Sequence, residues 1–370
     1  MRKICAVTTT RAEYGIMSGL LEKINNNAQL QLIVSGTHLS GKFGHTIDEI
    51  SLPVTKTIDI EIEKSPAHAL ALATEKFDTA FKELRPDIVL ILGDRYEIMG
   101  VAQAAMLNNI PIAHISGGDI TQGAIDDSIR HCITKMGHLH FTSCEEYRKR
   151  VIQLGENPSR VFNVGSLGVE NTRKVKLMNK DELEKSLDFK FGEKNILTTF
   201  HPVTLEGNAG KQFGELLSAF DELENTKIII TCPNSDEGSD EIYELIKNYE
   251  KTHNNVKVFK SLGLVRYLSC MRFVDMVVGN SSSGIYEVPS FKIPTINVGN
   301  RQKGRSQPAS IINCKAEKQD ILNAVKLGYE MDCSGTVNIY EQENTSEKIL
   351  EILLGFDLNG IIKKEFYDIL

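Results

Sequence analysis

Short, almost continuously apolar runs alternate with amphipathic stretches along most of this sequence. "KICAVTT" at 3–9, "DIVLIL" at 87–92 and "IPIAHI" at 110–115 are such runs, and "EYGIMSGLLEKI" is one of the amphipathic stretches between them. Strands that are apolar on both faces are typical of a parallel sheet covered by helices on both sides. The alternation therefore predicts βαβ units and an α/β fold with doubly wound sheets.

The alternation is interrupted once, at a charged stretch with few apolar residues, and it resumes with "NILTTFH" at 195–201. A chain of 370 residues is long enough for two domains. We expect an N-terminal domain at 1–168, a linker with a short helix at 169–193, a C-terminal domain at 194–352 and a tail at 353–370. We also expect the tail to pack back on the N-terminal domain and the linker to act as the hinge region.

The bulk properties argue against several classes of protein. A net charge of −7 disfavours a nucleic-acid-binding surface. No apolar run approaches the roughly 20 residues that span a bilayer, and the apolar run at the N-terminus is too short for a signal peptide. The seven cysteines include no CxxC pair. This pattern predicts a reduced, cytoplasmic protein without a structural metal site and without a membrane or nucleic-acid partner.

Polar side chains follow the strands of the first half, at the strand ends where open α/β sheets bind ligands. "TTTRAEYG" places Arg11 at the start of a helix, where a phosphate would be neutralised. "GTHLSG" contains His38, and "GDRYE" contains Asp94 beside Arg95. A partly desolvated carboxylate at a strand end acts as a base or holds a ligand hydroxyl group. The structural alternatives are a surface arginine, a surface histidine and an Asp–Arg ion pair that orders a turn.

The stretch "HISGGDITQGAIDDSIRHCITK" at 114–135 carries the densest group of ionisable side chains. They are Asp119, Asp126, Asp127, Arg130 and His131. Helix capping accounts for one aspartate at the start of a helix, but not for the whole group. On a helix, Asp127 lies three and four residues from Arg130 and His131. The spacing therefore predicts a cluster whose members orient one another.

The second half repeats this arrangement with other residue types. "HPVT" places His201 at a strand end, and "TCPNSDEG" places Asn234 at another. "VVGNSSSGIYE" reads as a strand, then small hydroxyl residues, then a helix, which is a phosphate-binding arrangement formed by Ser281, Ser282 and the backbone at Gly284. The structural alternative is a capped helix with a polar first turn.

Two further charged residues fit a nucleotide. Glu287 lies one turn into this helix, and a carboxylate there suits the two hydroxyl groups of a ribose. Arg301, in "GNRQKGR", follows the next strand as a second phosphate partner. The sequence contains no GxxxxGK[ST], and no GxGxxG follows the first strand. These absences disfavour kinase-type use of ATP and a dinucleotide cofactor.

Several of these stretches together resemble the hydrolysing UDP-N-acetylglucosamine 2-epimerases, which serve bacterial sialic-acid pathways. The matching stretches, in order, are "TRAEYG", "GTHLS", "GDRYE", "GAIDDSIRH", "HPVT", "GNSSSGIYEVPS" and "NRQKGR". The resemblance implies a GT-B architecture of two Rossmann-like domains, with the active site in the interdomain cleft. It also implies a small nucleotide-sugar substrate, no metal, no other cofactor, and a homodimer or homotetramer.

The reaction that the resemblance implies converts UDP-N-acetylglucosamine and water into N-acetylmannosamine and UDP. The C2 proton is removed, UDP leaves, and the resulting 2-acetamidoglucal is hydrated. Such an elimination needs a base for a weakly acidic C–H bond and groups that stabilise the departing diphosphate. This requirement explains why carboxylates and histidines gather in one site.

The resemblance also assigns roles to residues. Its catalytic residues are Asp94, Asp126, Asp127, His38, Arg130, His131 and His201. Its substrate-binding residues are Arg11, Arg95, Ser116, Asp119, His201, Asn234, Ser281, Ser282, Gly284, Glu287 and Arg301. Asp94 and Asp126 are the two candidates for the base that removes the C2 proton.

One short stretch departs from the family pattern. Many relatives carry "HIEGGE" where this chain has "HISGGD", so Ser116 replaces a glutamate and Asp119 a second one. A serine is neither acid nor base near neutral pH, and its smaller side chain makes room for an additional acetamido group. Related enzymes of legionaminic acid pathways act on a nucleotide-linked 2,4-diacetamido sugar, so the alternative substrate that the resemblance implies is UDP- or GDP-linked N,N′-diacetylbacillosamine.

Three other functions remain alternatives at this level. A GT-B glycosyltransferase would use a similar UDP site, but it would not need the acidic "DDSIRH" cluster in this form. A non-hydrolysing 2-epimerase would return the sugar still linked to UDP. A nucleotide-sugar sensor would bind without turnover, although the acidic cluster is complete.

Overall fold

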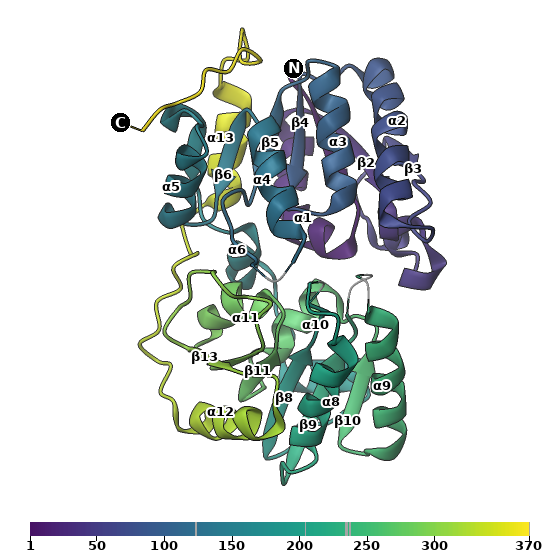
Figure 1. The fold of residues 1–370 in the computed structure, drawn as a ribbon, viewed down its shortest axis with the longest axis vertical. Coiled ribbons are helices and arrows are strands. Elements are labelled where there is room, and N and C mark those ends of the chain that lie inside the picture. Colours follow the sequence, from purple (N-terminus) through teal and green to yellow (C-terminus); the bar gives the residue numbers. More distant parts are fainter. Residues whose placement is uncertain (123, 204, 234–235, 237, 370) are drawn as a thin grey trace. The chain divides into compact units, whose positions relative to one another are not determined.

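The computed structural model describes residues 1–122, 124–203, 205–233, 236 and 238–369, and the chain divides into two compact units (Figure 1). The first unit comprises Met1–Asp119, Asp126–Asn171 and the chain from Tyr340 onward. The second unit comprises Ile120–Ile125 and Thr172–Ile339. Each unit is built around a parallel sheet of its own.

The first unit contains a seven-stranded sheet in the order β3-β2-β1-β4-β5-β6-β7, and every neighbouring pair is parallel. Its strands are β1 (Lys3–Thr8), β2 (Gln29–Ser35), β3 (Lys56–Ile58), β4 (Ile88–Leu92), β5 (Ile112–Ile115), β6 (Leu139–Thr142) and β7 (Val161–Asn163). The direction of winding reverses between β1 and β4. Ligands of such sheets bind beyond the carboxyl ends of the strands at this reversal.

Helices cover both faces of this sheet (Figure 1). They are α1 (Arg11–Asn27), α2 (Pro66–Leu84), α3 (Tyr96–Leu107), α4 (Asp126–Met136), α5 (Glu145–Gln153), α6 (Leu167–Lys174), which runs across the unit boundary, and α13 (Thr345–Gly355). Single 3-10 turns are η1 (Gly36–Leu39), η2 (Gly41–Phe43), η3 (Thr46–Glu49) and η4 (Pro158–Arg160). One core cluster joins α1 and α13 through Met17 and Ile349, and another joins α2 and α3 through Phe77 and Val101.

The first helix begins where it does because its N-terminal amides are capped. The Thr10 hydroxyl accepts a hydrogen bond from the Glu13 amide at 3.2 Å, and the Glu13 carboxylate accepts one from the Thr10 amide at 3.3 Å. This reciprocal capping box satisfies two amides that would otherwise lack partners. It places the start of α1, with Arg11, directly after the carboxyl end of β1.

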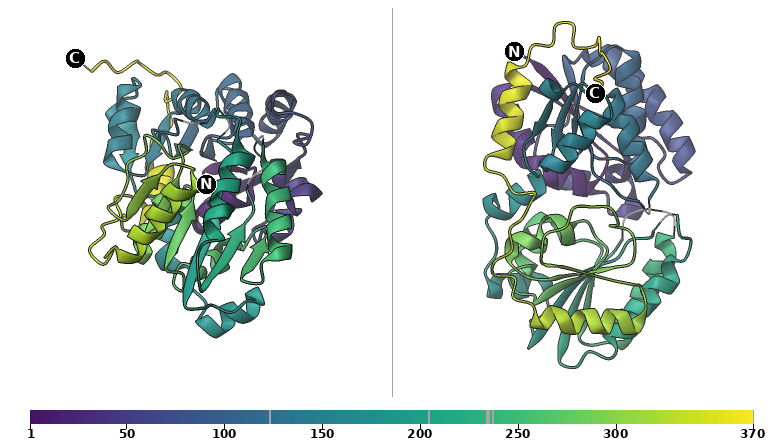
Figure 2. Two further views of the ribbon diagram at one scale, coloured as in Figure 1. Left: turned by 60° about the horizontal axis from the view of Figure 1, so that its bottom comes forward. Right: turned by 60° about the vertical axis from the view of Figure 1, so that its left-hand side comes forward.

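The second unit repeats the same topology with six strands in the order β10-β9-β8-β11-β12-β13. The strands are β8 (Lys194–Thr199), β9 (Thr226–Thr231), β10 (Val256–Phe259), β11 (Met276–Gly279), β12 (Thr295–Val298) and β13 (Ile311–Cys314). The helices are α7 (Lys180–Leu187), α8 (Ala209–Phe220), α9 (Ser239–Thr252), α10 (Gly263–Cys270), α11 (Ser283–Tyr286), the 3-10 turn η5 (Val288–Phe291) and α12 (Lys318–Glu330). Figure 2 shows α12 lying along one face of this sheet.

The observed boundaries differ from the expected ones at two places. The expected linker at 169–193 contains α7 and most of α6, and the boundary between the units falls at 171/172. The second unit ends at 339, not at 352, because α13 packs on α1 of the first unit, where Lys23 and Glu347 form an ion pair. The tail continues over the first unit, and the Arg160 guanidinium donates to the carbonyl of Ile361 at 2.9 Å.

Two structural features are absent from the described part of the chain. None of its helices combines the length and apolar character that crossing a bilayer requires. Its histidine, cysteine and carboxylate side chains form no group of three suited to a metal ion.

Candidate active site

The centre of the ionisable cluster in the first unit is Arg130 on α4. Its side chain is only 1% exposed, yet it carries a full charge. Its guanidinium group forms an ion pair with Asp94, lies 3.6 Å from Asp127 Oδ1 and donates to the Asp119 carbonyl at 2.8 Å. A charge buried to this degree requires such partners. Arg130 therefore fixes the end of β4 and the start of α4 to one another.

The imidazole of His131 lies on the same helix beside this cluster. Its Nε2 is 3.7 Å from Asp127 Oδ2, and its side chain is 27% exposed. Its Nδ1 is buried and has no hydrogen-bond partner among the described residues. Burial lowers the pKa of His131, although Asp127 acts in the opposite direction. A neutral, half-buried imidazole can accept or deliver a proton near neutral pH.

His38 is placed differently. It is fully buried, and its Nε2 and Nδ1 lie 3.0 Å and 2.9 Å from the hydroxyl groups of Thr8 and Thr46. Burial lowers its pKa to about 4. With both ring nitrogens occupied, His38 holds the turn after β2 against the end of β1. This geometry favours a positioning role for a residue that the motif pattern predicts to be catalytic.

Two arginines stand at helix starts near the same strand ends. Arg11 forms an ion pair with Glu49 at 2.7 Å, while its Nη2 is buried and has no hydrogen-bond partner among the described residues. Arg95 precedes α3 and pairs through Nε with the fully buried Glu97 at 3.1 Å. Asp126 is the first residue of α4.

The turn that departs from the family pattern is a strained one. Ser116 has a φ of 65°, a left-handed conformation that is uncommon for residues other than glycine. Gly118 has a φ of 85°, and a Cβ atom there would lie 2.5 Å from the Tyr147 carbonyl oxygen. Asp119, at the end of the turn, is buried. The backbone of this turn is constrained, so a substitution at residue 116 changes the side chain while its position stays the same.

In the second unit, Asn280 ties two strand ends together. Its side chain accepts from the His201 amide at 2.6 Å and donates to the His201 carbonyl at 2.7 Å. Gln302 donates to the Asn280 carbonyl at 2.7 Å, and Arg301 contacts the same carbonyl at 3.4 Å. Sequence reasoning selected His201 and Arg301 but missed Asn280 and Gln302. The available signal was the position of Asn280 within "GNSSSG", directly after a strand.

The hydroxyl-rich turn follows β11 directly. Ser281 and Ser282 precede the four-residue helix α11, and the Ser282 side chain makes no capping hydrogen bond. A Cβ atom at Gly284 would lie 2.7 Å from Thr295 Cγ2, so glycine allows α11 to pack closely on β12. Asn234, predicted from its motif, lies outside the described residues.

Glu287 ends this short helix in a largely desolvated position. Burial raises its pKa to about 7, although the Ser283 hydroxyl and the charge of Arg305 lower it. Burial also raises the pKa of the nearby Tyr267 to about 12. A half-buried, partly desolvated carboxylate is suited to accept hydrogen bonds from ligand hydroxyl groups.

Residues 120–125 of the loop between β5 and α4 belong to the second unit, which the sequence did not indicate. Arg305 donates from Nε to the Ile120 carbonyl and from Nη2 to the Thr121 hydroxyl, each at 3.1 Å. The Gln122 amide donates to the Lys303 carbonyl at 3.3 Å. The stretch "GGDITQGAIDD" thus contributes to both units. Its ends, with Asp119, Asp126 and Asp127, belong to the first unit, and residues 120–125 between them belong to the second.

The chain is a two-domain α/β protein with two Rossmann-like units. One unit carries a carboxylate–guanidinium–imidazole cluster, and the other carries a hydroxyl-rich turn followed by a half-buried glutamate. The family model described as UDP-N-acetylglucosamine 2-epimerase matches residues 22–354. The chain belongs to this family, as its motifs predicted.

Two curated relatives are especially similar. The chain is 45% identical over 329 residues, 86% of each chain, to the Campylobacter jejuni GDP/UDP-N,N′-diacetylbacillosamine 2-epimerase (hydrolyzing). It is 40% identical over 391 aligned positions, 100% of this chain and 98% of the relative, to the Escherichia coli polysialic acid biosynthesis protein P7.

A solved structure agrees in fold. The Methanocaldococcus jannaschii UDP-GlcNAc 2-epimerase, solved with UDP-GlcNAc and UDP, superimposes with a TM-score of 0.81 at 16% identity, covering 95% of this chain and 99% of that one. At this identity the likeness establishes the fold alone. The predicted GT-B architecture of two Rossmann-like domains is confirmed.

Proposed function

We propose that the protein is a hydrolysing 2-epimerase of a 2-acetamido sugar linked to a nucleoside diphosphate. The observation that carries the proposal is the buried guanidinium of Arg130, which holds the carboxylates of Asp94 and Asp127 beside the imidazole of His131. Carboxylates and a neutral imidazole held together are the groups required for proton transfer at carbon. Membership of the family supports the same reaction class.

The first half of the proposed reaction is an elimination. Asp94 or Asp126 removes the proton from C2 of the sugar, and the C–H electron pair forms the C1=C2 double bond. The bond between C1 and the diphosphate oxygen breaks, and its electrons leave with the nucleoside diphosphate. The arginines of the first unit, Arg11 and Arg95, supply positive charge for this leaving group.

The second half is a hydration of the 2-acetamidoglucal. The oxygen of water bonds to C1, and a proton returns to C2 on the opposite face, which inverts that carbon. We assign His131 to proton transfer with the water, because its lowered pKa keeps it neutral near pH 7. No electrons are gained or lost overall, so the reaction consumes no oxidant or reductant.

The second unit is proposed to hold the nucleotide. Glu287 accepts hydrogen bonds from the ribose hydroxyl groups, and the phosphates bind the turn and its neighbours. The nucleotide-binding residues are His201, Asn234, Ser281, Ser282, Gly284, Glu287 and Arg301. His38, Ser116 and Asp119 complete the proposed sugar site, with His38 as a positioning residue.

Two sugars are candidate substrates. UDP-N-acetylglucosamine is supported by the description of the family. N,N′-diacetylbacillosamine linked to UDP or GDP is supported by the name of the 45% identical Campylobacter jejuni relative and by Ser116, which is smaller than the glutamate of many family members. The two differ at C4 and C6 of the sugar, away from the C1–C2 chemistry that both require.

Release of nucleoside diphosphate without any acceptor sugar tests the reaction class. Purified protein is incubated separately with UDP-N-acetylglucosamine, UDP-N,N′-diacetylbacillosamine and GDP-N,N′-diacetylbacillosamine, and the released UDP or GDP is measured with a coupled assay. We expect stoichiometric release from at least one of these three nucleotide sugars, and the highest kcat/KM identifies the physiological substrate. Absence of release from all three, with the protein folded, would contradict the proposal and favour a transferase or a sensor.

We also propose a cytoplasmic homodimer or homotetramer. All seven cysteines are unpaired, which suits a reducing compartment. Light scattering after size exclusion measures the oligomeric state, and a monomer would contradict this part of the proposal.

A further inference from the structure

We propose, on the basis of the proposed function, that His114 is a positioning residue that fixes Asp94 against helix α4. His114 lies on β5, two residues before the strained Ser116, and is fully buried. Its imidazole is in contact with two elements of the catalytic cluster, but it does not face the solvent. None of the motifs quoted from the sequence gives this histidine a role.

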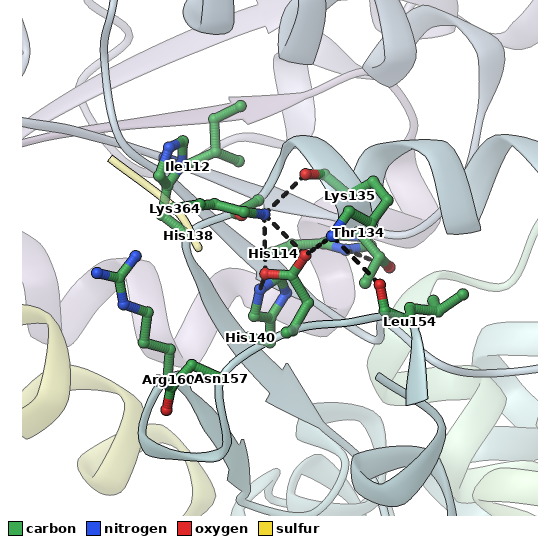
Figure 3. Close-up of polar contacts among 12 residues, drawn as sticks. Ile112, His114, Thr134, Lys135, His138, His140, Leu154, Asn157, Arg160 and Lys364 are labelled. Carbon is green, nitrogen blue, oxygen red and sulfur yellow. Dashed lines mark hydrogen bonds and ion pairs between the residues drawn. The ribbon is translucent and has the colours of Figure 1, made fainter. Parts of the chain in front are cut away.

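His114 contacts the backbone before Asp94 with one ring nitrogen and helix α4 with the other. Its Nε2 lies 2.8 Å from the carbonyl oxygen of Gly93, the residue directly before Asp94. Its Nδ1 lies 3.2 Å from the hydroxyl oxygen of Thr134, which is one helical turn after Arg130 on α4. Figure 3 shows His114 and Thr134 side by side. The Gly93 amide also donates to the Ile115 carbonyl at 3.1 Å, so both backbone groups of Gly93 are held from β5.

The hydrogen-bond directions follow from the chemistry of the groups. A carbonyl oxygen only accepts, so Nε2 of His114 must carry the proton that it donates to Gly93. Burial lowers the pKa of His114 to about 3, so the ring is neutral and Nδ1 is an acceptor. The Thr134 hydroxyl has one proton, and it donates this proton to the Arg130 carbonyl oxygen at 2.9 Å, so its 3.2 Å contact with Nδ1 is the weaker branch of a shared hydrogen bond. A single tautomer therefore connects α4, through His114, to the turn that carries Asp94.

The neighbouring Gly117 supports this assignment. Its backbone is not in the left-handed region, so conformation alone does not require glycine there. A Cβ atom at this position would lie 3.0 Å from the Thr134 hydroxyl oxygen and 3.2 Å from His114 Nδ1. Glycine at 117 thus leaves room for the hydroxyl–imidazole contact. The same contact gives a physical reason for one glycine of the "GG" pair.

The consequence for the reaction is geometric. Arg130 of α4 pairs directly with Asp94. His114, which contacts Thr134 of α4, holds the carbonyl of Gly93, the residue before Asp94, so both supports of Asp94 depend on α4. A displacement of about 1 Å at a reacting group lowers turnover roughly 100-fold. His114 is fully buried and does not reach the exposed face of the cluster, where a substrate would bind. Its loss should therefore reduce kcat and leave KM nearly unchanged.

Steady-state kinetics of four variants test the inference. His114→Phe removes both hydrogen bonds at similar size, and we expect kcat to fall about 100-fold with KM unchanged within about threefold. His114→Gln keeps an amide N–H that can reach Gly93, and should recover most of that loss. Thr134→Val keeps His114 but removes the hydroxyl donor, and should lower kcat about tenfold. His138→Gln is the matched control, a buried histidine that accepts from the Ile112 amide at 3.2 Å.

Each outcome decides between positioning and simple packing. Unchanged kcat in a folded His114→Phe variant, or an equal loss in the Phe and Gln variants, would overturn the inference. If His114→Phe does not fold, Thr134→Val decides, and normal kcat in that variant also overturns it. A fall in kcat for His138→Gln equal to that of His114→Phe would show that any buried histidine of this sheet has the effect.

A measurement without turnover separates this inference from the proposed function. The imidazole ¹⁵N spectrum of the wild type should contain a neutral Nε2–H tautomer that persists to about pH 5 and is lost in His114→Gln. If wild-type protein releases no nucleoside diphosphate but this signal is present, the proposed function fails and the geometry stands. If release occurs and the His114 signal reports the Nδ1–H tautomer, the inference fails alone.

Discussion

At the scale of single residues, the site depends on a cation buried among carboxylates. Arg130 is almost completely removed from water, so its charge is balanced by Asp94 and Asp127 in fixed positions. The sequence spacing identified Arg130 and Asp127 as helix neighbours. It did not identify Asp94, which is 36 residues away in the chain, as the third member of the group.

The two candidate bases give the first prediction. Asp94→Asn and Asp126→Asn each remove a carboxylate and keep its size, and at least one should lower kcat about 100-fold or more, the usual contribution of a general base. Asp48→Asn, at a carboxylate that is 82% exposed, is the control and should retain normal turnover. Near-normal turnover in both active-site variants, with the fold intact by circular dichroism, would show that neither carboxylate is the base.

Glu287 gives a second prediction, on pH dependence. Its pKa is raised to about 7 from the usual 4.5, so the folded state binds this proton more tightly than the unfolded chain does. The stability of the protein should therefore fall as pH rises from about 4.5 to about 7, because ionisation of a buried carboxylate is unfavourable. Glu287→Gln should melt at or above the wild-type temperature at pH 8.

The same variant should bind nucleoside diphosphate about tenfold more weakly by calorimetry, since an amide accepts fewer hydrogen bonds from ribose. Wild-type affinity would argue against the ribose-binding role. A melting temperature well below that of the wild type at pH 8 would contradict the proposed direction of the pH effect.

At the scale of elements, helix α4 is secured at both ends. Its start carries Asp126 and Asp127. At its end, the carbonyls of Lys135 and of Gly137, the residue directly after the helix, each accept from Lys364 of the tail at 2.7 Å. Lys364 also pairs with the buried carboxylate of Glu156, which is bound in turn by Lys135 and His140 (Figure 3). A cation at a helix C-terminus is favourable because the last carbonyls there lack helical partners.

Glu156 provides a test of this anchoring. Burial would raise its pKa, but the bonds from His140, Lys135 and Lys364 lower it to about 2. The stabilisation is therefore fully present above about pH 4.5 and is lost as pH falls toward 2. Glu156→Gln removes the carboxylate that the partly exposed Lys135 and Lys364 share, and should lower the free energy of unfolding by about 1–3 kcal/mol at pH 7.

The control for Glu156 is Glu146→Gln on α5, whose carboxylate is 56% exposed and pairs with Arg150. A surface ion pair contributes about 1 kcal/mol or less. Urea unfolding at pH 7 and at pH 3 measures both variants. Equal effects of the two substitutions would show that the Glu156 network does not anchor the helix.

At the scale of the whole molecule, the repeated strand–helix alternation predicted two α/β domains, because the spacing of apolar residues indicates which faces of a strand or helix are buried. The same spacing does not indicate on which domain a helix packs. The apolar stripe of α13 follows the second domain in sequence, yet Ile349 and Leu353 lie in the core of the first unit. The position of the loop 120–125 was likewise not predictable, because it depends on backbone contacts with Arg305.

The site was predictable to the extent that function requires charged side chains at strand ends. Asp94, Asp127, Arg130 and His131 were selected from the sequence, and the structure places them together around α4, while their roles in the reaction stay predictions. Asn280, Gln302 and His114 were missed. These residues act through backbone carbonyls and amides, and such contacts leave no pattern of charge or spacing in the sequence.

The fate of the hydrogen at C2 tests the proposed reaction at the level of the whole protein. Wild-type protein in D₂O is given the nucleotide sugar that it turns over, and the products are followed by ¹H and ³¹P NMR. Elimination and hydration predict a free sugar with the manno configuration, one deuterium at C2 and an equal amount of nucleoside diphosphate. A sugar that is still linked to the nucleotide, or a free sugar that keeps its original C2 hydrogen and configuration, would contradict the proposed function.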